Sequence, residues 1–238
     1  MKRVIFVISL FAVLLCSCAT VQVATFNSEG QVPMYMTSCP DAKYEEFKYI
    51  EVSGSIFSSP SGLMDKMQKK AKEVGADAVV NAANSRLLEG SGICGVIFAK
   101  AGSRELAAAC RSYKTPLKDG SAVITPSFNM KNVKAIIHAV GPNFNVTPGA
   151  FDTLCDAYYN SLAVLKENGY HSISFPLISA GIFGGNQTDP AGESVKQCIR
   201  AYKKFTEDYP DYDVDVMLCA FSSSEMISAK RMCEKLGV

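Results

Sequence analysis

The sequence has almost no net charge, few histidines, and none of the spacings that build metal sites or phosphate-binding loops. Its 24 Lys and Arg against 23 Asp and Glu leave a formal charge of +1, so no electrostatic footprint for nucleic acid is indicated. Only His138 and His171 are present, and the nine cysteines form no C-x-x-C pair, which argues against a metal site. The absence of G-K-S and G-K-T excludes a P-loop. We therefore predict no metal, no cofactor and no specific nucleic-acid partner.

Long apolar runs are also missing, except at the N-terminus. Lys2 and Arg3 precede an apolar run over residues 4–15, an order typical of secretory signals, and the run is shorter than the roughly 17–25 residues of a membrane-spanning helix. Residues 15–18, Leu-Cys-Ser-Cys, resemble the bacterial lipobox, with Cys18 as the better lipidation candidate. The alternative is an ordinary cleaved signal with incidental cysteines. The sequence thus predicts a signal peptide (1–18), a tether (19–45) and a domain (46–238), lipid-anchored to a membrane of the bacterial cell envelope.

Beyond the tether, short buried segments alternate with amphipathic ones. Asp189 with Pro190 is a cap followed by a first-turn proline, Gly169 is a helix stop, and Ser222 with Glu225 forms a capping box. The alternation predicts a single α/β domain of three layers, α/β/α, around a mostly parallel or mixed sheet. Strands are expected at 47–52, 78–81, 122–125, 133–140, 173–178 and 214–221, and helices at 63–74, 92–101, 103–113, 151–165, after 189 and after 222.

Two glycine-rich segments follow expected strands, where ligands bind in such sheets. One runs from Asn-Ala-Ala-Asn at 81–84 to Gly-Ser-Gly-Ile-Cys-Gly at 90–95, and the other is Ser-Ala-Gly-Ile-Phe-Gly-Gly at 179–185. Glycines let the backbone approach a ligand, and amides at a helix start bind anions. Together the segments can hold a diphosphate, although either alone could merely serve a turn. Residues 90–95 also fit G-x-G-x-x-G, but the strand and acidic residue that this motif requires are not in place.

The segments taken together resemble the macrodomain family in order and spacing. They are Asp-Ala-Val-Val-Asn-Ala-Ala-Asn at 77–84, the glycine loop, Ala-Ile-Ile-His-Ala-Val-Gly-Pro at 135–142 and Phe-Pro-Leu-Ile-Ser-Ala-Gly-Ile-Phe-Gly at 175–184. The resemblance covers residues 47–238 and implies a mixed sheet of six or seven strands that binds ADP-ribose or an ADP-ribosylated molecule. The ligand-binding residues that it implies are Ile56, Ala82, Asn84, Gly90, Ser91, Gly92, Ile93, Ser179, Ala180, Gly181, Ile182, Phe183 and Phe221.

The resemblance also implies roles. Both loops would hold the diphosphate, Phe221 would stack on adenine, and the catalytic residues would be Asn84, which orients the distal ribose, and Gly184, which shapes the water site. An Asn amide suits vicinal hydroxyls, but Asn84 could instead satisfy its own backbone in a turn. Phe221 could equally belong to the core, and His138 fits a hydrogen-bonded core residue better than a catalyst.

Two positions depart from the family pattern. Ser55 stands where members often carry an Asp that contacts adenine, and Cys94 stands where many hydrolytic members carry an Asp that activates water. Other hydrolytic members lack that Asp and are thought to use a ligand phosphate. We therefore expect binding of ADP-ribose and hydrolysis of mono-ADP-ribose esters or related derivatives such as the O-acetyl ester. The alternatives are a binding module without turnover, and a scaffold lipoprotein whose site has decayed.

Overall fold

The structure, a computed structural model, describes residues 3–8, 21–24, 46–52 and 76–237. The described strands form one sheet in the order β2-β3-β1-β8-β7-β4-β6-β5. Strand β2 is antiparallel to β3 and β5 is antiparallel to β6, while the other neighbours are parallel, so the sheet is mixed, as predicted. The strands are β1 (Arg3–Ile8), β2 (Val21–Ala24), β3 (Glu46–Val52), β4 (Ala78–Ala83), β5 (Ala122–Pro126), β6 (Ala135–Val140), β7 (Ser172–Pro176) and β8 (Asp215–Cys219).

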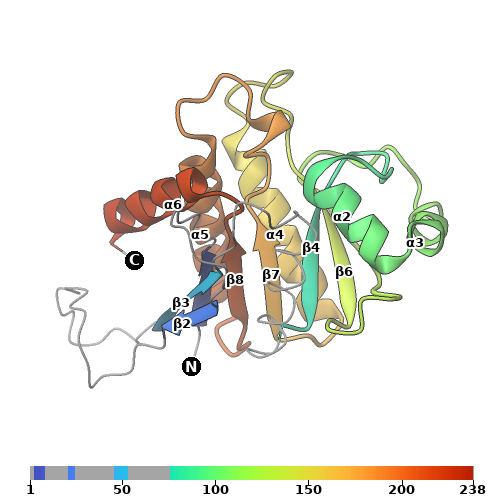
Figure 1. Cartoon of the computed structure of the whole chain (residues 1–238), viewed down its shortest axis with the longest axis horizontal. Coiled ribbons are helices and arrows are strands. Elements are labelled where there is room, and N and C mark those ends of the chain that lie inside the picture. Colours follow the sequence, from blue (N-terminus) through green and yellow to red (C-terminus); the bar gives the residue numbers. More distant parts are fainter. Residues whose placement is uncertain (1–2, 9–20, 25–45, 53–75, 238) are drawn as a thin grey trace, which may run out of the picture.

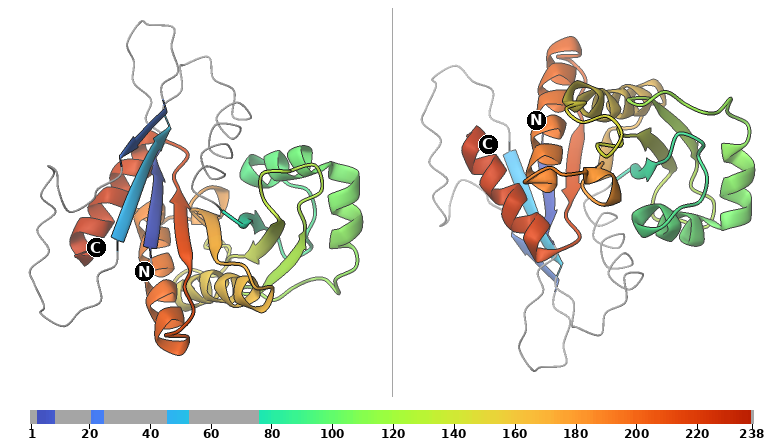
Figure 2. Two further views of the ribbon diagram at one scale, coloured as in Figure 1. Left: turned by 90° about the horizontal axis from the view of Figure 1, so that it is seen from below. Right: turned by 90° about the horizontal axis from the view of Figure 1, so that it is seen from above.

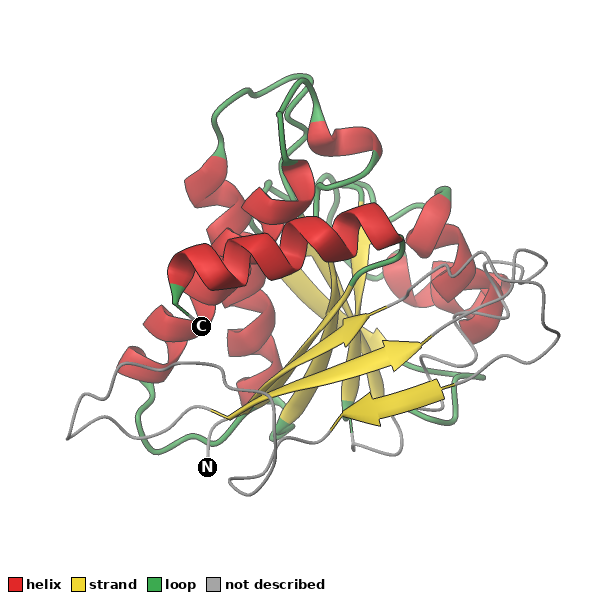
Figure 3. Cartoon of the chain, turned by 60° about the vertical axis from the view of Figure 1, so that its left-hand side comes forward, coloured by secondary structure: helices red, strands yellow, loops and turns green. Residues whose placement is uncertain are grey.

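Helices cover both faces of the sheet, which confirms the three-layer prediction (Figure 2). Helices α2 and α3 pack on one face through residues such as Phe98 and Leu106, and α4, α5 and α6 pack on the other. Strand β4 divides its side chains between them, with Val80 on the α4 side and Val79 on the α2 side. Figure 3 shows α6 lying across the twisted sheet. The helices are α2 (Gly92–Ala101), α3 (Ser103–Cys110), α4 (Phe151–Glu167), the short 3-10 helix η1 (Ile182–Gly184), α5 (Pro190–Asp208) and α6 (Ser223–Leu236).

The predicted helix signals occur where the sequence places them. The Asp189 carboxylate accepts from the Gly192 amide at 2.9 Å, Ser222 and Glu225 form the capping box, and Gly169 has a φ of 68° just beyond α4. Three strands are shorter than expected: β6 begins at Ala135 and not at 133, and β7 and β8 pair only as far as Pro176 and Cys219. Proline has no amide to donate to a further rung, so residues 177–178 and 220–221 belong to loops. The expected helix at 63–74 lies outside the described residues.

Strands β1 and β2 come from segments that the sequence assigns to a leader and a tether. In the structure, β1 pairs with both β3 and β8. Its Val and Ile residues favour a strand, and the same apolar run satisfies a signal peptide. These two strands raise the sheet to eight, above the six or seven that the resemblance implies. Cleavage after residue 17 would remove β1, and it stays a prediction because Cys18 lies outside the described residues.

Within the residues that the structure describes, no helix has the length and hydropathy needed to cross a membrane. Nor does that part of the chain contain a group of three or more His, Cys, Asp or Glu side chains placed to hold a metal ion.

Candidate functional site

Four neighbouring strands of the sheet, β8, β7, β4 and β6, are parallel, so their carboxyl ends meet at one edge. Each strand is followed there by a loop, and these loops stand together above the strand ends in Figure 1. We call them the β4 loop (84–91), the β6 loop (141–150), the β7 loop (177–189) and the β8 loop (220–222). Because β4 is hydrogen-bonded to β7, the two glycine-rich segments leave adjacent strands in the same direction.

The β7 loop turns its carbonyl groups toward the protein. The Ile178 carbonyl accepts from Ser194, the Ile182 carbonyl from Asn145 and the Gly184 carbonyl from Gln187, at 2.7–3.0 Å. The carbonyls of Leu177, Gly181 and Phe183 accept backbone amides. In contrast, no hydrogen bond within the described residues uses the amides of Ser179, Gly181, Ile182 and Phe183 as donors. Only the Ala180 amide within this stretch donates inward, to the Leu177 carbonyl at 3.3 Å. Neighbouring amides without such a bond are available to bind an anion.

The β6 loop clamps the β7 loop into this shape. The Phe144 amide donates to Phe183 and the Asn145 side chain to Ile182, both at 2.9 Å. The Ser179 hydroxyl donates to the Pro142 carbonyl at 2.8 Å, and Ser179 has a φ of 57°. A Cβ on Gly141 would lie 2.4 Å from the Ser179 hydroxyl, so the close approach of the two loops requires glycine there.

Gly184 fits this packing more directly than it fits a water site. It is buried, its amide donates to Gly181 at 2.8 Å, and a Cβ would lie 3.1 Å from Pro190. In this structure Gly184 therefore joins the loop to the start of α5. Its predicted catalytic role stays a prediction.

Asn84 organises the β4 loop. Its Oδ1 accepts from the amides of Arg86 and Leu88 at 3.2 and 3.1 Å, and its Nδ2 donates to the Leu88 carbonyl at 2.6 Å. Sequence reasoning left open whether Asn84 serves a turn or a ligand, and these contacts show the turn role. An Asn amide has two N–H donors, and the second one is not used within the described residues.

The β4 loop continues into α2, whose N-terminus is open. Ser91 is the N-cap but makes no side-chain capping bond, and the first turn has no acidic residue. By comparison, Asp189 caps α5, while Ser222 and Glu225 cap α6. The free amides and the helix dipole favour an anion at α2. Gly90, Ser91 and Gly92 are exposed beside it.

Helix α2 also holds the β4 loop close. A Cβ on Gly95 would lie 2.5 Å from the Gly90 carbonyl oxygen. The Cys94 thiol lies 3.7 Å from the Leu88 carbonyl and is 5% exposed. Burial raises the pKa of this thiol, so Cys94 is a neutral packing residue at neutral pH.

His138 is a buried residue of β6, as the sequence analysis preferred. Its Nδ1 pairs with Asn81 at 3.0 Å and its Nε2 with Thr125 at 2.9 Å. Burial lowers the His138 pKa to about 4. The ring is therefore neutral near pH 7 and serves the sheet.

Apolar side chains line the same edge. Phe221 is 51% exposed, which excludes the core alternative, and its amide donates to Glu225 at 2.6 Å. Leu88, Val146 and Ile182 are exposed in the β4, β6 and β7 loops, a pattern that sequence reasoning missed for Leu88 and Val146. Of the other predicted residues, Ala82, Ile93, Ala180 and Phe183 are partly exposed. Ile56 and Ser55 lie outside the described residues.

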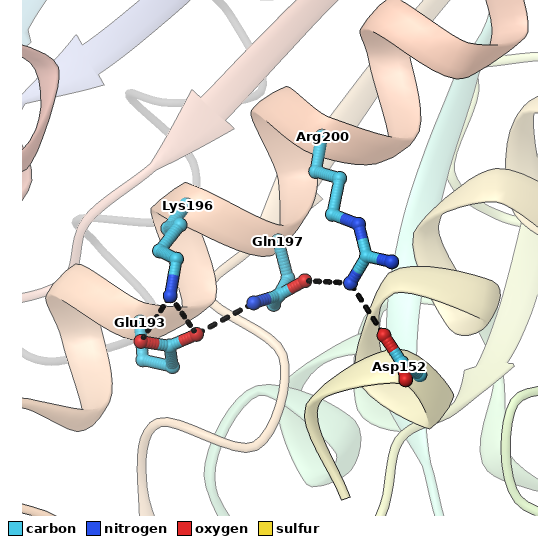
Figure 4. Close-up of polar contacts among 5 residues, drawn as sticks. All are labelled: Asp152, Glu193, Lys196, Gln197 and Arg200. Carbon is cyan, nitrogen blue, oxygen red and sulfur yellow. Dashed lines mark hydrogen bonds and ion pairs between the residues drawn. The ribbon is translucent and has the colours of Figure 1, made fainter. Parts of the chain in front are cut away.

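A polar network connects α5, which follows the β7 loop, with α4 (Figure 4). Arg200 of α5 bonds to Asp152 of α4 and to Gln197. Gln197 donates to Glu193, which also pairs with Lys196 at 3.1 Å. Within this network only the Arg200–Asp152 pair joins the two helices, and both of its side chains are exposed, so it contributes little stability.

The fold and the loops define a three-layer α/β domain in which backbone amides at one sheet edge form a candidate anion site. A family model of the macro domain matches residues 80–192, which include both glycine-rich segments. A macro domain-containing protein of Ralstonia nicotianae is 34% identical over 170 residues, which cover 70% of this chain and 92% of that protein. An O-acetyl-ADP-ribose deacetylase of Cronobacter turicensis is 40% identical over 131 residues, or 52% of this chain and 72% of that enzyme.

Solved structures of macrodomains resemble this chain in fold and in sequence. The Oceanobacillus iheyensis macrodomain with ADP superposes with a TM-score of 0.60 and 31% identity, covering 68% of this chain and 84% of that one. The Trypanosoma brucei macrodomain in complex with ADP-ribose gives 0.56 and 27%, covering 66% and 62%. The chain belongs to the macrodomain family.

Proposed function

We propose that this macrodomain binds ADP-ribose with the diphosphate between the β4 and β7 loops. The observation that carries the proposal is the set of free amides in the β7 loop, beside the uncapped start of α2. Backbone amides hold a diphosphate without cationic side chains. The half-exposed Phe221 supplies a face for adenine, and the remaining Nδ2 hydrogen of Asn84 reaches a ribose hydroxyl.

The reaction we propose is hydrolysis of an ester on the distal ribose, as in O-acetyl-ADP-ribose. Water attacks the acyl carbon while a ligand phosphate accepts the water proton, and loop amides stabilise the negative charge that develops in this step. The acyl C–O bond to the ribose then breaks, the phosphate returns the proton to the ribose oxygen, and the acid and free ADP-ribose are released. The deacetylase similarity supports this reaction class, and the phosphate as base suits a site in which position 94 is a neutral thiol.

Titration calorimetry with ADP-ribose and a turnover assay on O-acetyl-ADP-ribose test the proposal. Gly181→Glu is the blocking variant, because a Cβ there has no atom of the described, non-adjacent residues within 4 Å. The added carboxylate therefore has room to extend beside the free amides. Ile227→Glu adds the same charge at an exposed site on α6. We expect Gly181→Glu to lose binding and turnover and Ile227→Glu to retain both. Equal affinities in the two variants would contradict the proposed site.

A second candidate function is binding without turnover. It is favoured by Cys94, which offers no carboxylate to activate water. The two functions separate in one experiment, since a binding module gives a normal ADP-ribose isotherm and no release of acetate above the uncatalysed rate. Hydrolysis abolished by Gly181→Glu would exclude this second candidate.

We further propose that the chain is a bacterial envelope lipoprotein anchored through Cys18. The support is the order of features in residues 1–18, where a cationic start precedes an apolar run and then Cys18, as in secretory signals. Mass spectrometry of the purified protein tests it: the expected N-terminus is a lipidated Cys18, and Cys18→Ser should leave the membrane fraction. An intact Met1 would contradict the anchor and keep β1 in the sheet.

A further inference from the structure

Two buried hydroxyl groups hold the backbone at the start of the β7 loop. Tyr158 of α4 and Ser194 of α5 are both fully buried. The Ile178 amide donates to the Tyr158 hydroxyl at 2.9 Å, and the Ser194 hydroxyl donates to the Ile178 carbonyl at 2.7 Å. The two hydroxyls lie 2.7 Å apart. Both peptide groups of one residue are thus bonded to side chains from two different helices.

The proton positions follow from this geometry. A serine hydroxyl has a single hydrogen, and that of Ser194 points to the Ile178 carbonyl. Ser194 must therefore accept from Tyr158, whose own oxygen accepts from the Ile178 amide. The result is a closed ring of three hydrogen bonds, with the Pro176 carbonyl 3.3 Å from the Tyr158 hydroxyl as a second acceptor. A buried ring of this kind leaves one orientation for the Ile178 backbone.

Ile178 directly precedes the free amides. The next residue, Ser179, has a φ of 57°, a conformation that an L-residue keeps only where its surroundings impose it. A rotation of the Ile178 peptide would redirect the amides of Ser179 and the residues after it. The β6 loop holds the far part of the β7 loop through Ile182 and Phe183, and the hydroxyl ring holds its beginning.

We infer that Tyr158 and Ser194 are positioning residues, which orient the free amides of the β7 loop for a diphosphate before ligand arrives. This inference rests on the proposed function. When the amides are already in place before the ligand binds, the binding free energy is not reduced by the cost of ordering the loop. Disruption of the ring should therefore weaken the ligand more than it weakens the fold.

The test compares Tyr158→Phe and Ser194→Ala with Ser161→Ala in the full chain. Tyr158→Phe keeps the ring that packs on Phe175 at 5.1 Å and removes only the hydroxyl. Ser161 is the matched control, because it is a fully buried residue of the same helix whose hydroxyl donates to Ala157 within α4. Its removal costs a buried hydrogen bond without touching the β7 loop.

We expect calorimetry to show ADP-ribose bound about tenfold more weakly by each ring variant, a loss of about 1.4 kcal/mol, and less than twofold change in Ser161→Ala. The Tyr158→Phe/Ser194→Ala double variant should bind about as weakly as the weaker single variant, since the ring is broken only once. Hydrogen exchange of the unliganded protein should quicken at Ser179–Phe183 in the ring variants alone. Melting temperatures establish that each variant is folded.

The outcomes are distinguishable. Wild-type affinity in the ring variants, or equal losses in Ser161→Ala, would overturn the positioning role while leaving ADP-ribose binding intact. A wild-type protein that binds no ADP-ribose would overturn the proposed function instead. Faster exchange confined to the β7 loop together with weaker binding supports the inference.

Discussion

The contact between Gly90 and Gly95 allows the β4 loop to be displaced by a single methyl group. A Cβ at position 95 would lie 2.5 Å from the Gly90 carbonyl oxygen, whereas ordinary contact begins at 3.4 Å, so the loop would have to retreat by about 0.9 Å (3.4 − 2.5). Overpacking of this kind costs about 1–3 kcal/mol, and alanine recovers roughly 1 kcal/mol as a better helix former. We expect Gly95→Ala to lose about 1 kcal/mol of unfolding free energy, measured by urea denaturation.

The effect on ligand should be larger than the effect on stability. A misplacement near 1 Å can cost about 100-fold where geometry is demanding, so we expect ADP-ribose to bind Gly95→Ala at least about tenfold more weakly in calorimetry. Gly169→Ala is the matched control: it places alanine at a φ of 68°, with no atom within 4 Å of the Cβ, at the far end of α4. It should cost about 1 kcal/mol through backbone strain and leave affinity unchanged. A folded Gly95→Ala protein with wild-type affinity would refute the reasoning.

Three further predictions concern single side chains. Burial lowers the His138 pKa in the fold to about 4, below its ordinary 6.5. The unfolded chain therefore binds the proton more tightly, and the free energy of unfolding should fall by about 3 kcal/mol from pH 6.5 to pH 4. Urea titrations of His138→Gln should show a smaller dependence of that free energy on pH. Cys94→Ala should change turnover by less than about twofold, because the thiol is buried and neutral. A tenfold loss in the turnover assay would instead indicate that Cys94 is catalytic. Asn84→Asp keeps both acceptor bonds but replaces the N–H group that donates to Leu88 by a negatively charged oxygen near the proposed diphosphate. Calorimetry should show more than tenfold weaker binding of ADP-ribose. Urea denaturation should show a loss of about 1 kcal/mol in the free energy of unfolding.

The sequence predicted the layers, the mixed sheet and the caps because each has a local cause. The helix starts are determined by contacts between residues close in sequence, namely Asp189 with Pro190 for α5 and Ser222 with Glu225 for α6. The glycine-rich segments were likewise visible, since glycine marks close approach. What local pattern could not give was which peptide groups stay free, because that depends on Asn145 of the β6 loop and Tyr158 of α4, which are remote in sequence from the β7 loop.

Asn84 and β1 show two further limits. An asparagine after a strand suits a turn and a ligand equally, and only the three bonds within its loop decide that it holds the turn. An apolar, β-branched run suits a signal peptide and a strand equally. The tertiary structure supplies parallel partners for it in the uncleaved chain, and the proposed signal cleavage would remove that strand.

The distribution of helix caps and of charge indicates where along this edge an anion is stable. Asp189 and Glu225 occupy the starts of α5 and α6 with the chain's own carboxylates, so a diphosphate would meet repulsion there. Helix α2 has neither a side-chain cap nor an acidic first turn, and Cys94 keeps that turn free of negative charge. A carboxylate at position 94 would favour activation of water but oppose the phosphate. If the site binds ADP-ribose as proposed, the neutral thiol at position 94 therefore favours binding of the diphosphate over activation of water.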